Sequence, residues 1–271
     1  MSIAHARPVS DTMTMLRRNV LRNLRYPSGP ITVIGVPAVF LLLFVYVFGQ
    51  TLGAGMSTGG TREEYLAYIT PAILLMAAVS APQMIAVWIS MDMTEGIVAR
   101  FRTMAIFRGS VLAGHALSGT ILIVAAITVL LGITLLLGHR PAADPLDWLA
   151  FAGFAVLVGL AFSWLAVALG LAAKRPDSAG NLPLLLMVLP MLSGGFVPVE
   201  SLPGWMQGFA RYQPFTPIID TFRGLLAGAP DGSVAVWALS WTVAITVIGY
   251  AWSLWLYRRH AAPSTGRATG T

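Results

Sequence analysis

Long runs without charge are the dominant pattern of this chain. Six stretches contain no Asp, Glu, Lys or Arg for 22 residues or more. A helix needs about 20 mainly apolar residues to cross the hydrocarbon core of a bilayer. The pattern therefore predicts an all-α integral membrane protein with six transmembrane helices. We expect these spans near residues 31–49, 65–91, 110–137, 148–173, 179–196 and 233–256.

A different pattern precedes the first span. Between residues 10 and 26, apolar positions recur at spacings of three and four, which places them on one helical face. They are Met13, Leu16, Val20 and Leu24, and the opposite side carries Arg17, Arg18, Arg22 and Arg25. An apolar face beside an Arg-rich flank suits the headgroup layer, so the pattern predicts an N-terminal amphipathic helix lying on the membrane. A plain topology signal is the alternative interpretation.

The loop 92–108 separates the second and third predicted spans. Asp92 and Glu95 have capping-box spacing, so we expect a short helix to begin there. Apolar residues would line one side of this helix, and Arg100, Arg102 and Arg108 supply charge. Such a helix can rest on lipid or dock onto a soluble partner, and its aromatic and Arg content is also typical of a protein interface.

Residues 197–231 are too apolar for a solvated loop and too charged and Pro-rich for a span. Two short helices in the outer leaflet, near 202–211 and 216–227, fit this composition better. Prolines also interrupt two of the predicted spans: the second contains Pro71 and Pro82, and the fifth contains Pro183 and Pro190. Neighbouring helices can satisfy the carbonyl groups that such prolines free.

Charge sets the expected orientation. With six spans, the segments 1–30, 92–108, 174–177 and 258–271 share one side and hold 13 of the 17 basic residues. This positive-inside bias puts both termini in the cytoplasm of a bacterial plasma membrane. We divide the chain into a cytoplasmic amphipathic helix (1–30), a six-span domain (31–257) and a disordered tail (258–271). Sixteen of the 17 basic residues are Arg, which suggests a GC-rich bacterial genome.

Signals for catalysis are few. There is no cysteine, which excludes thiolate metal sites, and no GxxxxGK[ST] loop, so ATP would have to bind another chain. We therefore expect no catalytic residue, no metal and no bound cofactor. We place no Asp, Glu, Lys or Arg within the predicted spans, which argues against a proton- or sodium-driven carrier. His115 is the one histidine expected within the membrane, at the start of the third span.

Two motifs resemble those of a known family. One runs from Asp92-Met-Thr-Glu-Gly-Ile-Val-Ala-Arg-Phe-Arg to Leu112-Ala-Gly, and the other from Ser193-Gly-Gly-Phe-Val-Pro-Val-Glu to Asp220-Thr-Phe-Arg-Gly-Leu-Leu-Ala-Gly. The chain resembles ABC-2 type exporter permeases, in particular the daunorubicin/doxorubicin-resistance group of actinobacteria. Ala105 departs from the Pro that this group often has after the coupling segment.

The resemblance implies a paired permease, as a homodimer or heterodimer, above P-loop ATPase subunits that bind ATP and Mg²⁺. It places ATPase coupling at Glu95, Gly96, Arg100, Phe101 and Arg102, together with the N-terminal Arg17, Arg18 and Arg22. Spans 2 and 5 would line the substrate path, with Met84, Trp88, Met187 and Met191 as candidates. Phe196, Trp205, Asp220 and Arg223 would form an outer gate.

These residues also have simpler interpretations. Met and Trp on the spans can serve packing alone, Asp220 and Arg223 can pair only with each other, and Trp205 can be a lipid anchor. The expected function is an ATP-driven exporter permease for an amphipathic drug, a secondary metabolite or a lipid. A permease for a lipid-linked glycan and a membrane sensor or assembly factor without transport activity are the alternatives.

Overall fold

The computed structural model describes residues 8–49, 61–94, 109–196 and 199–261, and every regular element within them is helical. The α-helices are α1 (Pro8–Arg25), α2 (Ser28–Leu43), α4 (Arg62–Thr94), α6 (Ser110–Leu136), α7 (Pro145–Ala172), α8 (Pro176–Asn181), α9 (Leu184–Val188), α10 (Gly204–Tyr212), α11 (Phe215–Leu226) and α12 (Gly232–Ala261). A π-helical turn, η1 (Phe44–Phe48), extends α2, and η2 (Leu189–Leu192) and η3 (Val199–Ser201) are 3₁₀ turns.

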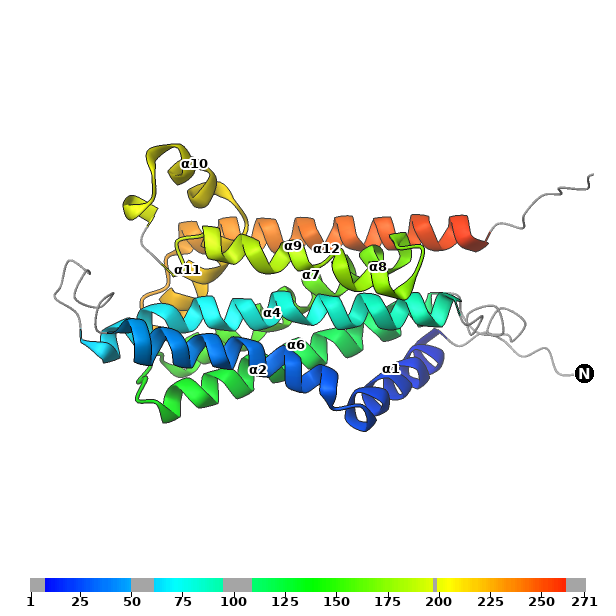
Figure 1. Ribbon diagram of the computed structural model, residues 1–271, viewed down its shortest axis with the longest axis horizontal. Coiled ribbons are helices and arrows are strands. Elements are labelled where there is room, and N and C mark those ends of the chain that lie inside the picture. Colours follow the sequence, from blue (N-terminus) through cyan, green and yellow to red (C-terminus); the bar gives the residue numbers. More distant parts are fainter. Residues whose placement is uncertain (1–7, 50–60, 95–108, 197–198, 262–271) are drawn as a thin grey trace, which may run out of the picture.

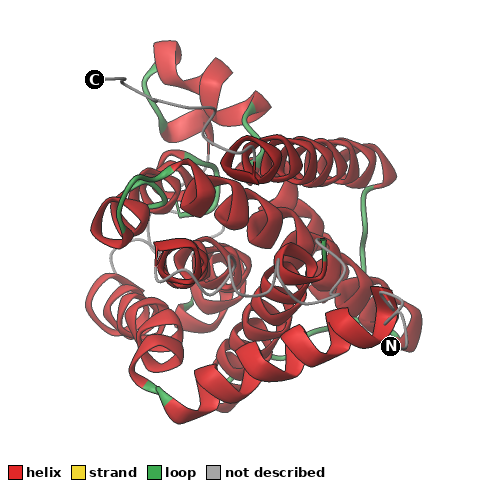
Figure 2. Cartoon of the chain, turned by 90° about the vertical axis from the view of Figure 1, so that its right-hand side faces the viewer, coloured by secondary structure: helices red, strands yellow, loops and turns green. Residues whose placement is uncertain are grey.

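The long helices lie side by side along the longest axis of the molecule (Figure 1). Helix α1 and the C-terminal turns of α12 lie at one end of this bundle, and α10 and α11 lie at the other. We call these the α1 end and the α10 end. Figure 2 views the bundle along its length and shows the helices packed in more than one layer. Five described helices, α2 with η1, α4, α6, α7 and α12, are long and apolar enough to cross a membrane.

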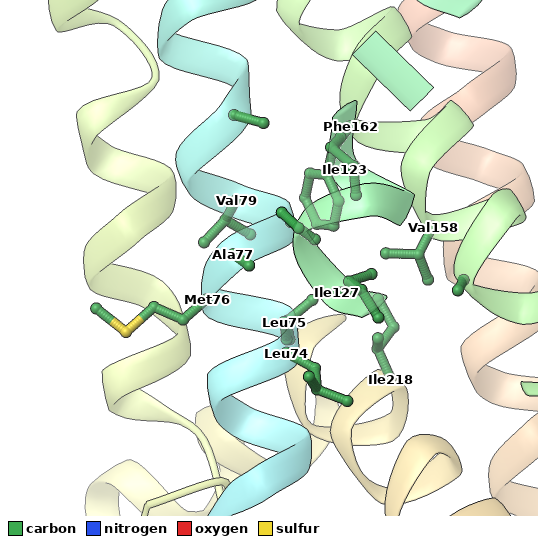
Figure 3. Packing of buried hydrophobic residues seen from close by; sticks show 14 of the residues in the cluster. Leu74, Leu75, Met76, Ala77, Val79, Ile123, Ile127, Val158, Phe162 and Ile218 are labelled. Carbon is green, nitrogen blue, oxygen red and sulfur yellow. The ribbon is translucent and has the colours of Figure 1, made fainter. Parts of the chain in front are cut away.

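Helix α4 is the centre of the packing. Its buried Leu74 and Leu75 lie among Ile123 of α6, Val158 of α7 and Ile218 of α11 (Figure 3). By contrast, only 22% of the span of α2 with η1 and 17% of the span of α12 are buried. A helix that is apolar all round is either buried in protein or faces lipid. The bundle thus surrounds one largely buried helix, α4, with peripheral helices suited to lipid contact.

Small residues let the helices approach closely. A side chain at Gly170 of α7 would put its Cβ 2.5 Å from the carbonyl oxygen of Ala86 in α4. A Cβ on Gly249 of α12 would lie 2.8 Å from the backbone nitrogen of Leu165 in α7. Helices in membranes associate through such close backbone packing, because lipid tails compete equally well for apolar side chains.

The prediction of one continuous helix over 179–196 is wrong. Residues 176–192 form α8, α9 and η2 in succession, and this broken segment packs along α4. Pro183 precedes α9 and Pro190 lies in the first turn of η2, and proline lacks the N–H that a continuous helix requires. The other five predicted spans agree with long helices to within a few residues.

The short helices predicted outside the spans can be compared with the helices of the structure. Helix α1 agrees with the predicted 10–26, and α10 and α11 agree with 202–211 and 216–227, to within two residues at each end. Residues 95–108 of the predicted coupling helix lie outside the described residues. Asp92 does not cap a new helix there, because it lies inside α4, which continues to Thr94.

Candidate functional site

A cavity of about 400 Å³ opens between the start of α2, the middle of α4 and α9. Drug-sized ligands occupy pockets of about 300–1,000 Å³, so this cavity is large enough for a small organic molecule. It is formed by Tyr26, Ser28, Gly29, Thr32, Val33, Val36, Ser80, Gln83, Met84, Val87, Trp88 and Met187.

The turn between α1 and α2 brings one wall of the cavity against α4. Only Tyr26 and Pro27 separate the two helices, so the first turn of α2 starts beside α4. The Ser80 hydroxyl of α4 donates a hydrogen bond to the Val33 carbonyl of α2 at 3.2 Å. A Cβ on Gly29 would lie 2.0 Å from the Met84 sulfur, so only glycine allows this approach without moving Met84.

The structure brings together three of the four residues predicted for the substrate path. Met84 and Trp88 of α4 and Met187 of α9 line the same cavity. Met191 is not part of its lining and is 45% exposed. Two helices far apart in sequence therefore share one cavity, as expected if the second and fifth crossings line a path. The role of these residues in substrate contact stays a prediction.

A cluster of charged groups surrounds Asp92 at the α1 end, next to the cavity. Arg18 of α1 bonds the Asp92 carboxylate directly, and Arg22 Nη1 lies 3.1 Å from its Oδ1. His115 Nε2 of α6 lies 2.8 Å from Asp92 Oδ2. Both Asp92 and His115 are only 2% exposed. A buried carboxylate requires such partners, and here they tie α1, α4 and α6 together.

Arg22 and Trp88 connect this cluster to the cavity. The Arg22 guanidinium lies over the Trp88 indole, with its central carbon 4.1 Å from the ring centroid. The Tyr26 ring lies on the cavity wall, 6.3 Å from the Trp88 ring. Cation–π contact adds to the ion pair, so Arg22 is held both by Asp92 and by Trp88. The wall of the cavity and the buried ion pair therefore share one side chain.

Sequence reasoning missed this cluster and treated the spans as free of assured charge. The predicted second span, 65–91, is free of charge, but α4 continues to Thr94 and carries the buried Asp92 one residue beyond that span. The available signal was the four-residue spacing of Arg18 and Arg22, which puts both on one face of α1. That face turns toward the protein, whereas Arg17 is exposed. On the predicted apolar face, Met13 and Leu24 are 60% and 71% exposed, whereas Leu16 and Val20 are partly buried.

The predicted coupling residues divide between described and undescribed parts of the chain. Arg18 and Arg22 contact Asp92, and Arg17 faces outward. The remaining candidates, Glu95, Gly96, Arg100, Phe101 and Arg102, lie outside the described residues. Their role in docking an ATPase stays a prediction.

At the α10 end, two of the four predicted gate residues, Asp220 and Arg223, lie beside the N-terminal part of α4. Arg223 pairs with Asp220, lies 4.3 Å over the Tyr68 ring and donates a hydrogen bond to the Tyr68 carbonyl at 3.3 Å. The Tyr68 hydroxyl donates to the Gly194 carbonyl at 2.8 Å. Phe196 is buried, with its ring centroid 5.3 Å from that of Phe44. Trp205 stands apart and is 83% exposed, as expected of a lipid anchor.

Comparison with known proteins identifies the family. The model of the ABC-2 type transporter family matches residues 10–227, which include α1 through α11. The chain belongs to the ABC-2 type transporter family. With its long apolar helices, it is therefore a multi-pass membrane protein of a transporter family.

Individual relatives agree with this assignment. The daunorubicin resistance ABC transporter permease protein DrrB1 of Streptomyces coeruleorubidus is 30% identical over 226 residues, which are 83% of this chain and 78% of the relative. A probable doxorubicin resistance ABC transporter permease protein DrrC of Mycobacterium tuberculosis is 29% identical over 235 residues, which are 87% of this chain and 84% of the relative. The similarity to permeases of this kind thus extends over most of the chain.

Proposed function

We propose that this chain is the transmembrane permease subunit of an ATP-driven exporter that moves an amphipathic drug, a secondary metabolite or a lipid out of the cytoplasm or the inner leaflet. The observation that carries this proposal is the drug-sized cavity between α4 and α9 in a member of the ABC-2 family. The relatives named for drug resistance support the cargo class. The sequence has no P-loop, so a separate ATPase subunit would supply the energy.

The proposal includes six membrane crossings with both termini in the cytoplasm. Five crossings correspond to the long helices, and the broken segment α8–α9–η2 would be the fifth crossing in chain order. Two observations support this. The segment packs along α4, and α8 lies toward the α1 end whereas α10 and α11 lie at the opposite end (Figure 1). Lys and Arg concentrate at the α1 end, which would then face the cytoplasm.

Coupling to the ATPase would act at the α1 end. The segment 95–108 begins three positions after Asp92, and its Glu95, Gly96, Arg100, Phe101 and Arg102 would seat on the ATPase surface. The ion pairs of Asp92 with Arg18 and Arg22 bind α1 to the base of this segment. A displacement of the segment would therefore reach both α1 and the cavity wall, because Arg22 also contacts Trp88.

Transport would follow from rocking of the helices. ATP-driven closure of two ATPase subunits would move the permease pair and open a path between α4 and the α8–α9–η2 segment. At the α10 end, the contacts of Arg223 with Asp220 and Tyr68, and of Phe196 with Phe44, would have to rearrange for release. The cavity volume favours a small amphipathic cargo over a lipid-linked glycan, which needs a wider continuous channel.

A transport assay tests the proposal. The permease and its ATPase are reconstituted in lipid vesicles, and accumulation of a fluorescent amphipathic dye is followed with and without ATP. We expect ATP-dependent accumulation that is lost when Arg100 and Arg102 are both changed to Glu, although expression and ATP hydrolysis persist. Arg140→Glu, at the opposite end of the bundle, is the matched control. Normal transport by the Arg100/Arg102 variant would exclude the coupling role.

A further inference from the structure

The wall of the cavity is uncharged and carries polar groups that lack partners. None of the described residues that line it is Asp, Glu, Lys or Arg. Three hydroxyl-bearing residues in this wall are Ser28 and Thr32 of α2 and Ser80 of α4. The Thr32 and Ser80 hydroxyls are already bonded to backbone carbonyls of Ser28 and Val33. The wall contains two other polar side chains, those of Gln83 and Trp88, which have no hydrogen-bond partner among the described residues.

Gln83 presents a free amide to the cavity. Within the described part of the chain, its side chain makes no hydrogen bond, although its position in α4 is only partly exposed. The indole N–H of Trp88, one helical turn further on, is buried and has no acceptor among the same residues. Buried polar groups normally have partners, so the Trp88 N–H indicates a ligand or another polar molecule in the complete site, and the partly exposed Gln83 amide is accessible to one.

The positive charge of Arg22 beside the cavity disfavours binding of a cation. Arg22 lies on the Trp88 ring, and the adjoining cluster contains two guanidinium groups and one carboxylate. Arg22 thus places a guanidinium beside the cavity, and buried charges interact strongly because the surrounding dielectric constant is low. An anion would gain from this field at a distance. It would nevertheless lose its hydration against a wall that offers no direct counter-charge.

We infer that the cavity binds an uncharged aromatic molecule whose carbonyl or hydroxyl oxygen accepts a hydrogen bond from the Gln83 amide. The aromatic part lies between the Tyr26 and Trp88 side chains and the Met84 and Met187 thioethers, which adapt to flat surfaces. Gln83 is thus a specificity-determining residue. This inference rests on the proposed function, since it names the substrate class of the same cavity.

Binding to the purified permease alone tests the inference without ATP or transport. The probe is prodan, an uncharged naphthyl ketone whose emission shifts to the red when its carbonyl accepts a hydrogen bond. Its matched counterpart carries a trimethylammonium group on the same ring system. Energy transfer from protein tryptophans reports saturable binding in detergent. We expect prodan to bind at least tenfold more tightly than the cationic analogue.

Substitutions of Gln83 test whether its amide donates the hydrogen bond to the bound molecule. Gln83→Leu should weaken prodan binding about fivefold, the value of one hydrogen bond, and shift the bound emission to the blue. Gln83→Glu should reverse the preference in favour of the cationic analogue. Val36→Trp fills the cavity and should abolish the saturable component. Gln207→Leu, in the distant α10, should bind like the wild type.

The comparison of prodan with the cationic analogue on the wild-type protein tests the inference even if a variant fails to fold. Equal or tighter binding of the cationic analogue would overturn it. So would an unchanged affinity and emission in a folded Gln83→Leu protein. A permease that binds prodan as expected but does not transport it with ATP would count against the proposed function and leave the site assignment in place.

Discussion

At the residue scale, Asp92 has the most demanding surroundings in the described part of the chain. Its carboxylate is 2% exposed and is held by two arginines and a histidine from two other helices. A buried ion pair adds little net stability over an apolar pair, but removing one partner leaves the others uncompensated. The cluster thus fixes the position of α1 on the bundle.

Changing Asp92 to Asn should therefore destabilise the protein by about 3 kcal/mol, because Arg18 and Arg22 would lose their buried ion pairs with this carboxylate. Thermal unfolding in detergent measures the effect. Asp177→Asn, on the exposed start of α8, is the control and should change little. Adding Arg22→Gln to the Asp92→Asn protein should restore part of the loss. An Asp92→Asn protein as stable as the wild type would show that the cluster does not hold α1.

Burial of His139 should make the stability of the protein depend on pH. It lies between α6 and α7, outside the spanning segments, and burial lowers the pKa of its imidazole below the usual 6.5. The unfolded chain therefore binds a proton at a higher pH than the folded chain. This stabilising contribution is complete above the unfolded pKa and is lost as the pH falls toward the folded pKa.

The unfolding temperature should accordingly fall between about pH 7.5 and about pH 5.5. His139→Gln should flatten this fall, because the variant has no imidazole to protonate at this position. Parallel melting curves of the two proteins at several pH values provide the measurement. Identical slopes would assign the acid sensitivity to other groups.

At the element scale, α1 depends on a close approach to α6. A Cβ on Gly114 would lie 2.5 Å from Met15 Cβ and 3.1 Å from the Met15 backbone. Gly114→Leu should therefore push α1 away and cost about 1–3 kcal/mol. Trypsin should then cut faster after Arg18 and Arg22, as mass spectrometry of the fragments would show.

Gly132 offers the matched control on the same helix, because no other described residue beyond its own helical turn lies within 4 Å of a Cβ built there. Gly132→Leu should leave both stability and the trypsin pattern unchanged. Equal cleavage of the two variants would mean that the α1–α6 contact does not position α1.

The elements also show what the sequence can and cannot predict. Five spans were predictable because about 20 apolar residues in a row leave a chain few alternatives to a helix. The fifth predicted span failed because length and apolarity outweighed Pro183 and Pro190, which divide it into α8, α9 and η2. Helices α10 and α11 were predictable from apolar residues between prolines.

The candidate site was only partly predictable. Met84, Trp88 and Met187 were chosen because the resemblance placed the path at the second and fifth spans, and they do line one cavity. The contacts of Asp92 with Arg18 and Arg22 join residues more than 65 positions apart. No local pattern reveals such a pair. The spacing of Asp92 and Glu95 instead suggested a cap, although tertiary contacts keep Asp92 inside α4.

At the scale of the whole molecule, one buried helix connects two ends with different contacts. Helix α4 carries Asp92 at the α1 end, Trp88 and Met84 at the cavity, and Tyr68 near Arg223 at the α10 end. A movement of α4 would therefore reach all three regions. This arrangement fits a permease whose gates are driven from one side by another subunit.

The most direct test of that account is affinity purification of this chain from its native host in mild detergent, with mass spectrometry of the proteins that accompany it. Our account predicts a P-loop ATPase in roughly equal amount, retained through washing. A permease recovered without any ATPase, under conditions that preserve other ATPase–permease complexes, would contradict it.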